Sequence, residues 1–150
     1  MAQLTENIDI ILEHITSLLT NKYDQLLLGQ LGIGYSQYKL LVQFKGDRII
    51  RQNIIADNLG QTEASITRQI KILSLKGLIT RDIDLQNKKV KVVILTLLGS
   101  RIQQAARDII IKQNNDFLVD IEAEDQTKLL FNLNKLHHQL CLANDHKYYP

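Results

Sequence analysis

Most of the residues best suited to chemistry lie in two short parts of the 150-residue chain: residues 61–71, and the pair Lys88 and Lys89. The first part is rich in hydroxyl, amide and basic side chains, which can contact base edges and phosphate oxygens. Lysines in a polar loop can neutralise phosphate charge. These residue types point to nucleic-acid binding, and the candidate contacts are Ser36, Gln61, Thr62, Ala64, Ser65, Thr67, Arg68, Gln69, Lys71, Lys88 and Lys89.

The sequence offers little for catalysis. It has no glycine-rich phosphate loop, no nucleophile elbow and no pair of carboxylates at a spacing that demands acid–base work. Three of the four histidines crowd near the C-terminus. We therefore expect no enzymatic activity and no cofactor.

A second constellation lies close to the C-terminus. His137, Cys141 and Asp145 follow one another at i, i+4 and i+8, with His138 and His146 beside them. Such residues could hold zinc, but we favour a surface or dimer-interface role and expect no metal. Cys141 is also the only candidate for a redox sensor, and the alternative is an inert buried cysteine.

The charge is distributed unevenly along the chain. The whole sequence carries 18 Lys and Arg against 16 Asp and Glu. Residues 36–101 carry twelve basic against five acidic residues, a net charge of +7, whereas the flanks together carry −5. A basic middle suggests contact with a polyanion, and the alternative is an ordinary solvated surface.

Composition limits the class of protein. The length suits one domain, or two small pieces that share one core. No apolar run approaches the ~18 residues of a membrane helix, and the first seven residues do not resemble a signal peptide. One cysteine forms no internal disulfide and suits a reducing cytoplasm. We expect a cytoplasmic protein with no membrane contact.

Hydrophobic periodicity predicts helices at both ends. Residues 6–28 carry an apolar stripe, and Thr5 is a plausible N-cap. Two more long helices are expected after Gly99, separated by the acidic stretch 120–125. Between the ends we predict short helices over 36–44 (with Ser36 as cap), 52–59 and 62–76.

The hydrophobic period changes after the predicted helix 62–76. Residues 78–83 and 90–96 are rich in β-branched side chains and are predicted to form two strands. The polar loop 84–89 joins them. The pair is therefore predicted to be a hairpin with a basic tip.

Residues 55–68 have the pattern of two helices that cross at a tight turn. Ala56 is small enough for a close crossing, Gly60 suits a positive φ, and Thr62 is a good N-cap. Ile55, Leu59, Ile66 and Ile70 are spaced to form a small core. This pattern predicts a helix-turn-helix whose second helix enters the DNA major groove.

These features together resemble the MarR-type winged-helix transcription regulators. The resemblance covers essentially the whole chain and includes a recognition helix, the run KGLITR, a wing and an LTxxG sequence in that order. The residues that carry it are Ile55, Ala56, Leu59, Gly60, 65–68, Leu73, 76–81, Leu95, Thr96 and Gly99.

The resemblance implies a mainly α fold with a small β-hairpin wing, in an intertwined homodimer. Residues 34–100 would form the winged helix-turn-helix that binds double-stranded DNA, and residues 1–33 and 101–150 the helical dimerisation region. The resemblance also implies a transcription regulator, more often a repressor, that binds a pseudo-palindromic operator. Many members also bind a small-molecule effector between the two regions or sense oxidants through cysteine. A protein-interaction module with this fold is the alternative function.

Two positions depart from the family pattern. The family wing usually carries Asp-Arg-Arg, where Arg enters the minor groove and Asp orients it, and this chain has Asn87-Lys88-Lys89. Lysine is more strongly hydrated than arginine, so we expect mainly phosphate contacts there. The helix before the turn usually starts with Ser or Thr, and here Arg51 occupies that position, which leaves the helix start open by a residue or two.

Overall fold

The computed structural model describes residues 2–46 and 48–143. This part of the chain contains six helices and three strands. In order they are α1 (Ala2–Leu31), α2 (Tyr35–Leu41), β1 (Ile49–Arg51), α3 (Gln52–Leu59), α4 (Glu63–Leu75), β2 (Ile79–Ile83), β3 (Lys91–Leu95), α5 (Leu97–Leu118) and α6 (Ala123–Ala143). The expected class, mainly helical with a small β wing, is confirmed.

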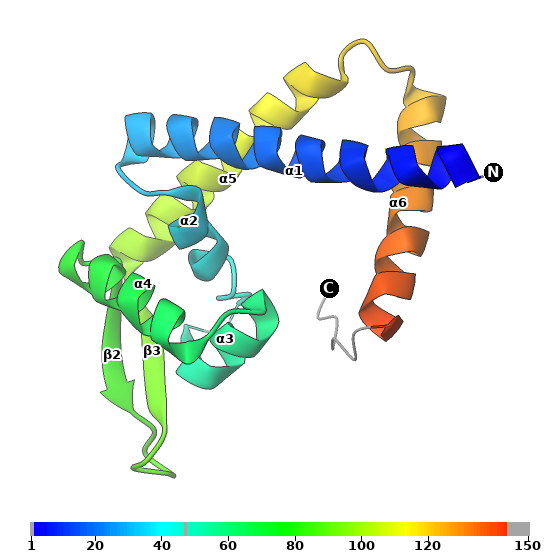
Figure 1. Ribbon diagram of the computed structural model, residues 1–150. Helices are drawn as coiled ribbons and strands as arrows, with labels where there is room; N and C mark the ends of the chain where they lie inside the picture. The colour runs from blue at the N-terminus through cyan, green and yellow to red at the C-terminus, as the bar shows by residue number, and fades with distance from the viewer. Residues whose placement is uncertain (1, 47, 144–150) are drawn as a thin grey trace.

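The elements form a lobe that hangs from two long helices. Helices α1 and α5 pack on each other and on α2, while α2 to β3 form the lobe below them (Figure 1). The three antiparallel strands lie in the order β1-β3-β2, and the β2–β3 hairpin extends away from the long helices. Helix α6 lies apart on the other side, so the described chain has an open shape (Figure 1).

One hydrophobic core joins the lobe to the long helices. Ile55, Ile66 and Ile70 of the lobe are fully buried in the same cluster as Leu27 of α1 and Ala106 of α5. Burial of apolar surface contributes ~25 cal/mol per Å², so this shared cluster stabilises both parts together. Helix α6, in contrast, buries none of its residues.

The turn between α3 and α4 has the predicted geometry. Gly60 ends α3 in the left-handed region with φ 59°, where a side chain would be strained. Ala56 is buried at the crossing. Thr62 then caps α4 by accepting a 3.2 Å hydrogen bond from the Ser65 backbone N–H. Helix α3 begins at Gln52 as expected, although Arg51 supplies no side-chain cap.

Helix α5 begins against the middle of the KGLITR segment, residues 76–81. Thr96 Oγ1 accepts a 2.9 Å bond from the Gly99 N–H and donates to the Leu78 carbonyl oxygen at 2.9 Å. Gly99 is buried inside the first turn of the helix. A Cβ on Gly99 would lie 2.0 Å from the Leu78 carbonyl oxygen, so only glycine allows this approach.

We expect Gly99→Ala to lower the free energy of unfolding by about 1–3 kcal/mol, because backbone must move to admit the methyl group. The matched control is Gly29→Ala, at a helical glycine with no atom within 4 Å of the added Cβ. That change should stabilise the protein by about 1 kcal/mol. Thermal unfolding of both variants measures the two effects, and a melting temperature unchanged by Gly99→Ala would contradict the packing argument.

Several predicted boundaries were wrong. Ser36 does not cap α2, because the helix begins one residue earlier; the Gln37 and Asp24 side chains accept from the Gly34 and Tyr35 N–H groups instead. Thr5 lies inside α1 and does not precede it. Helix α2 ends at Leu41, and Phe44 is buried in the following turn.

Strand β1 was not predicted from the sequence. Its three residues pair with β3, with Ile49 opposite Ile94 and Arg51 opposite Val92. So short a segment shows no period of its own, and its pairing with β3 is long-range. The predicted hairpin is confirmed, with strands one or two residues shorter than expected.

Candidate nucleic-acid interface

Helix α4 turns one face to the core and the other to solvent. Ile66, Ile70 and Leu73 are buried, as their spacing predicted. The opposite side of the helix and its N-terminus therefore remain available to a partner. The exposed candidates there are Thr62, Ala64, Thr67, Arg68 and Lys71.

Three of the candidate residues form a hydrogen-bonded group at the N-terminal end of α4. Gln61 Oε1 accepts from Ser65 Oγ at 3.1 Å and from Gln69 Nε2 at 2.9 Å. Both donors are partly buried. Ser65 and Gln69 therefore hold the Gln61 side chain in place, which the sequence alone did not indicate.

Thr67 is held from the neighbouring helix. Its Oγ1 accepts a 2.8 Å bond from Nε2 of Gln52, the first residue of α3. Gln52 is only 6% exposed and is the one buried polar residue of the described chain. Because a buried amide needs a partner, this bond fixes the rotamer of Thr67 on the exposed face.

The basic side chains of α4 point to solvent without partners. Within residues 7–46 and 48–143, neither Arg68 nor Lys71 makes an ion pair or a side-chain hydrogen bond. Exposed cations free of carboxylate partners can bind phosphates or base edges with no ion pair to break.

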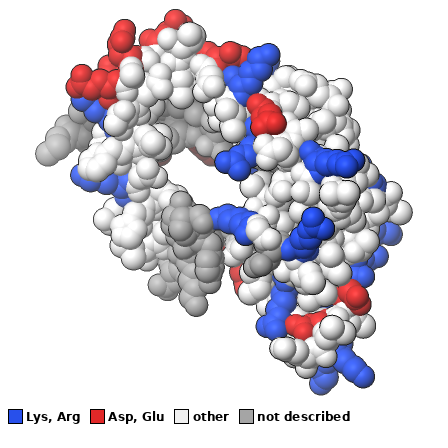
Figure 2. Space-filling view, turned by 180° about the vertical axis from the view of Figure 1, so that it is seen from behind, with Lys and Arg blue, Asp and Glu red and all other residues white. Residues whose placement is uncertain are grey.

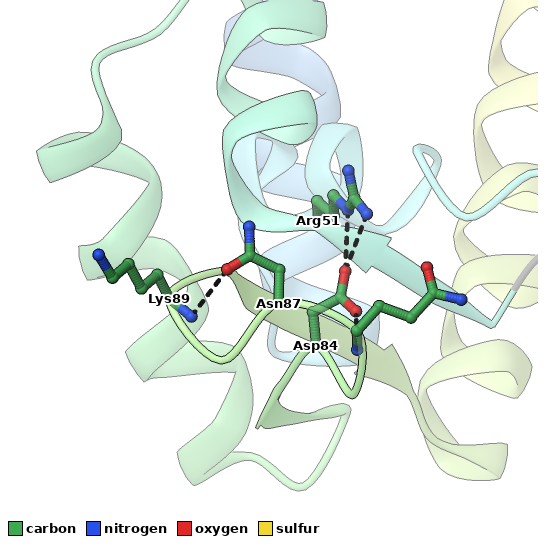
Figure 3. Close-up of polar contacts among 5 residues, drawn as sticks. Arg51, Asp84, Asn87 and Lys89 are labelled. Atoms are coloured by element: carbon green, nitrogen blue, oxygen red, sulfur yellow. Dashed lines mark hydrogen bonds and ion pairs between the residues drawn. The ribbon is translucent and has the colours of Figure 1, made fainter.

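The hairpin tip presents the two lysines. Asn87 shapes the turn, because its Oδ1 accepts from the Lys89 N–H at 3.2 Å and its carbonyl oxygen accepts from the Val90 N–H at 2.8 Å. Lys88 and Lys89 are both exposed, and the Lys89 side chain extends away from the base of the loop (Figure 3). In the part of the chain with described side chains, neither lysine forms an ion pair.

The base of the wing is tied to β1. The Arg51 guanidinium contacts Oδ2 of Asp84 through Nη2 at 2.9 Å and through Nε at 3.0 Å (Figure 3). Sequence analysis singled out Arg51 only as an unusual helix start. Its partner lies 33 residues away, so no local pattern could have indicated the contact.

Charge is unevenly distributed over the surface. Figure 2 shows Lys and Arg side chains spread over the lobe down to the wing tip with a few acidic side chains among them, and the largest acidic group at the opposite end. That acidic end corresponds to the loop between α5 and α6 and the first turn of α6, which contains Glu124 and Asp125. The uneven charge of the sequence is therefore also uneven in space.

Ser36 lies at a different place from the other candidates. It is exposed in the first turn of α2. Its neighbour Gln37 accepts a 3.2 Å bond from Nζ of Lys76, the C-cap residue that follows α4. Ser36 therefore belongs to the side of the lobe near the C-terminal end of α4, whereas Gln61 and Thr62 precede its N-terminus.

Three tyrosines meet where α1, α2 and α5 join. The rings of Tyr23 and Tyr35 are 5.1 Å apart and those of Tyr35 and Tyr38 are 6.1 Å apart. The Tyr23 hydroxyl donates to Asn114 Oδ1 of α5. Burial raises the pKa of all three hydroxyls, so they stay neutral at physiological pH. Tyr23 and Tyr38 are buried, in keeping with a packing role.

The residues near the C-terminus form no metal cluster in the described chain. His137 Nε2 lies 3.5 Å from Cys141 Sγ on α6, where His137 is exposed and Cys141 is only partly buried. No three His, Cys, Asp or Glu residues among those described could hold a metal ion. Asp145 and His146, which completed the zinc constellation, lie outside the described residues.

None of the described helices is long and apolar enough to cross a membrane. No protein-family sequence model matches the chain, and no curated protein sequence is significantly similar to it. Solved structures, in contrast, match it over nearly its whole length.

The structural relatives share one fold. A MarR-family transcriptional regulator from Rhodococcus sp. RHA1 has a TM-score of 0.77 at 18% identity, covering 89% of this chain and 94% of that chain. The S. aureus MepR–DNA complex has a TM-score of 0.76 at 24% identity, covering 88% of this chain and 97% of that chain. The regulator BldR of Sulfolobus solfataricus has a TM-score of 0.74 at 22% identity, covering 92% of this chain and 94% of that chain. The fold is therefore a winged helix of the MarR type.

Proposed function

We propose that the chain is a sequence-specific DNA-binding regulator of transcription. One observation carries the proposal: the exposed face of α4 and the tip of the adjoining wing present cations that have no acidic partner in the described chain. Those two elements are the ones that a winged helix places in DNA grooves. The S. aureus relative MepR was solved as a DNA complex, which supports the same use of the fold here.

The side chains divide into two roles on this proposal. Arg68 contacts a base edge in the major groove, with Ser65 and Thr67 beside it. Gln61, Thr62, Gln69 and Ser36 contact the sugar–phosphate backbone near helix N-termini. Ala64 lines the groove, and Lys71, Lys88 and Lys89 contact phosphates.

The protein acts as a homodimer on this proposal, with residues 1–33 and 101–150 as the dimerisation region and 34–100 as the DNA-binding region. The support is a set of apolar side chains that the single chain leaves exposed on its end helices. They are Ile8, Ile11, Ile15 and Leu18 on α1, Phe117 on α5, and Leu129, Leu130, Leu133, Leu136 and Leu140 on α6. A two-fold dimer would contact half-sites ~34–36 Å apart on a pseudo-palindrome.

Regulation follows from the spacing of the two lobes. We infer repression by occupancy of an operator, in the cytoplasm and without enzymatic activity. A small-molecule effector could relieve repression only if it binds the protein with different affinity in two states. In one state the two lobes have the spacing of the free protein, and in the other they have the spacing of the DNA-bound protein. The tyrosine group at the α1–α2–α5 junction lies between the two regions, although its burial supports packing more than ligand contact.

The second candidate is a protein-interaction module, or a redox-sensing regulator that acts through Cys141. Salt dependence separates DNA binding from an apolar protein contact, because only DNA binding releases counterions. The test is fluorescence anisotropy of a mixed-sequence duplex with the purified protein at about 50 and 200 mM salt. Binding that weakens at least tenfold supports the proposal, and no binding at either salt concentration favours the protein partner.

Lys88→Ala should weaken binding to operator and mixed-sequence DNA by the same factor, because a lysine on a phosphate carries no sequence information. The slope of log K against log salt should fall in magnitude by about 1. A titration of affinity against salt for wild type and variant measures this. An unchanged slope would remove Lys88 from the phosphate contacts.

A further inference from the structure

The wing projects beyond the strand that supports it. Strand β1 pairs with β3 only from Ile94 to Val92, whereas the β2–β3 pairing continues one residue further, to Ile83 and Lys91. The loop that carries Lys88 and Lys89 extends further still. A two-stranded ribbon is marginally stable alone, so the tip needs another support to keep one position.

Arg51 supplies a contact at this point. It is the last residue of β1, and β1 lies on the far side of β3 from β2. Its guanidinium reaches the loop that follows β2 and contacts Asp84 through two nitrogens (Figure 3). The ion pair therefore joins one edge of the sheet to the loop that leaves the other edge.

Asp84 in turn organises the loop. Its Oδ1 accepts from the Gln86 N–H at 2.9 Å, and its carbonyl oxygen accepts from the Asn87 N–H at 3.2 Å. The Asp84 side chain is only 14% exposed. The Gln86 N–H and the Arg51 guanidinium both lower the pKa of its carboxyl, so Asp84 stays ionised at physiological pH.

We propose that Arg51 is a positioning residue for the wing, acting on DNA through Asp84 and not by touching DNA. The next residue, Gln52, holds Thr67 of α4 in the corresponding way. The β1–α3 junction thus ties the major-groove helix and the wing to one point of the lobe. This inference rests on the proposed function, since it concerns how the DNA-binding surface is held.

Asp84→Asn separates positioning from direct contact. Removing an acid from a DNA-binding surface should leave affinity unchanged or raise it, if the acid only repels phosphate. A positioning role predicts the opposite, namely that Asp84→Asn and Arg51→Gln each weaken operator binding about 3- to 10-fold. The double variant should bind the operator with the same affinity as either single variant, because both changes break the same contact. Anisotropy titrations of the full chain measure all three.

Arg48→Gln is the matched control, because it removes the same charge just before β1 at an exposed residue that makes no ion pair in the described chain. Its effect should add to that of Asp84→Asn. Tighter binding by Asp84→Asn, or additive losses for Arg51→Gln and Asp84→Asn, would overturn the proposal and make Arg51 a direct phosphate contact.

Amide hydrogen exchange of Gln86 and Asn87 in the DNA-free protein tests the same inference without DNA. Arg51→Gln should make both amides exchange faster while core amides such as that of Ile70 stay protected. Equal exchange in wild type and Arg51→Gln would overturn the positioning role. A wild-type protein that binds no DNA but shows faster exchange in Arg51→Gln would refute the proposed function and leave the positioning intact.

Discussion

Arg68→Ala should weaken binding to the specific operator by about 5- to 150-fold, the equivalent of ~1–3 kcal/mol for a lost base contact. Affinity for random DNA should fall much less. The reason is the position of Arg68 on the exposed face of α4, where no carboxylate in the described chain competes for its guanidinium. Anisotropy titrations with operator and scrambled duplexes at one salt concentration measure both losses.

Lys112→Ala is the matched control for Arg68, because it removes an exposed cation from α5, outside the lobe. It should leave the operator-to-random affinity ratio unchanged. Equal losses for Arg68→Ala on operator and random DNA would show that Arg68 contacts a phosphate, and specificity would then have to come from other residues of α4.

The second large effect concerns the dimer. Leu133 and Leu136 lie one turn apart on α6 and are 39% and 36% exposed in the single chain. Changing both to Asp should convert the dimer to a monomer, because two buried carboxylates without partners oppose association. Operator affinity should then fall more than 100-fold, since a monomer engages only one half-site. Sedimentation and operator titration measure the two effects.

His138→Asp is the control for this double change, because residue 138 points to the opposite side of α6 by helical period. It adds an acid and should leave the dimer intact. A Leu133→Asp/Leu136→Asp variant that sediments as a dimer would place the interface elsewhere, on α1 or α5.

The helix-turn-helix could be predicted from the sequence because its signals are local. Gly60, Thr62 and the spacing of Ile66, Ile70 and Leu73 are each recognisable within one or two helical turns, and the structure confirms them. The hairpin was predicted for the same reason, since its two strands and their polar loop are consecutive.

The features that the sequence did not predict depend on contacts between residues that are far apart in the chain. Strand β1 exists only because β3 pairs with it, and the cap of α2 comes partly from Asp24, eleven residues before Tyr35. Arg51 looked like a poor start for a helix, and its ion pair with Asp84 becomes visible only when the sheet is assembled. The assignment of individual side chains to DNA stays a prediction, because local pattern shows which residues are exposed but not what they bind.

The most direct test of the account is selection of bound fragments from a random DNA pool by the purified full-length protein. We predict enrichment of a pseudo-palindrome with half-sites ~34–36 Å apart, as a two-fold dimer requires. Recovery of fragments without any enriched sequence would contradict sequence-specific regulation. It would mean that α4 and the wing contact only the sugar–phosphate backbone of DNA. Recovery of no DNA at all would contradict the proposed function and favour a protein partner.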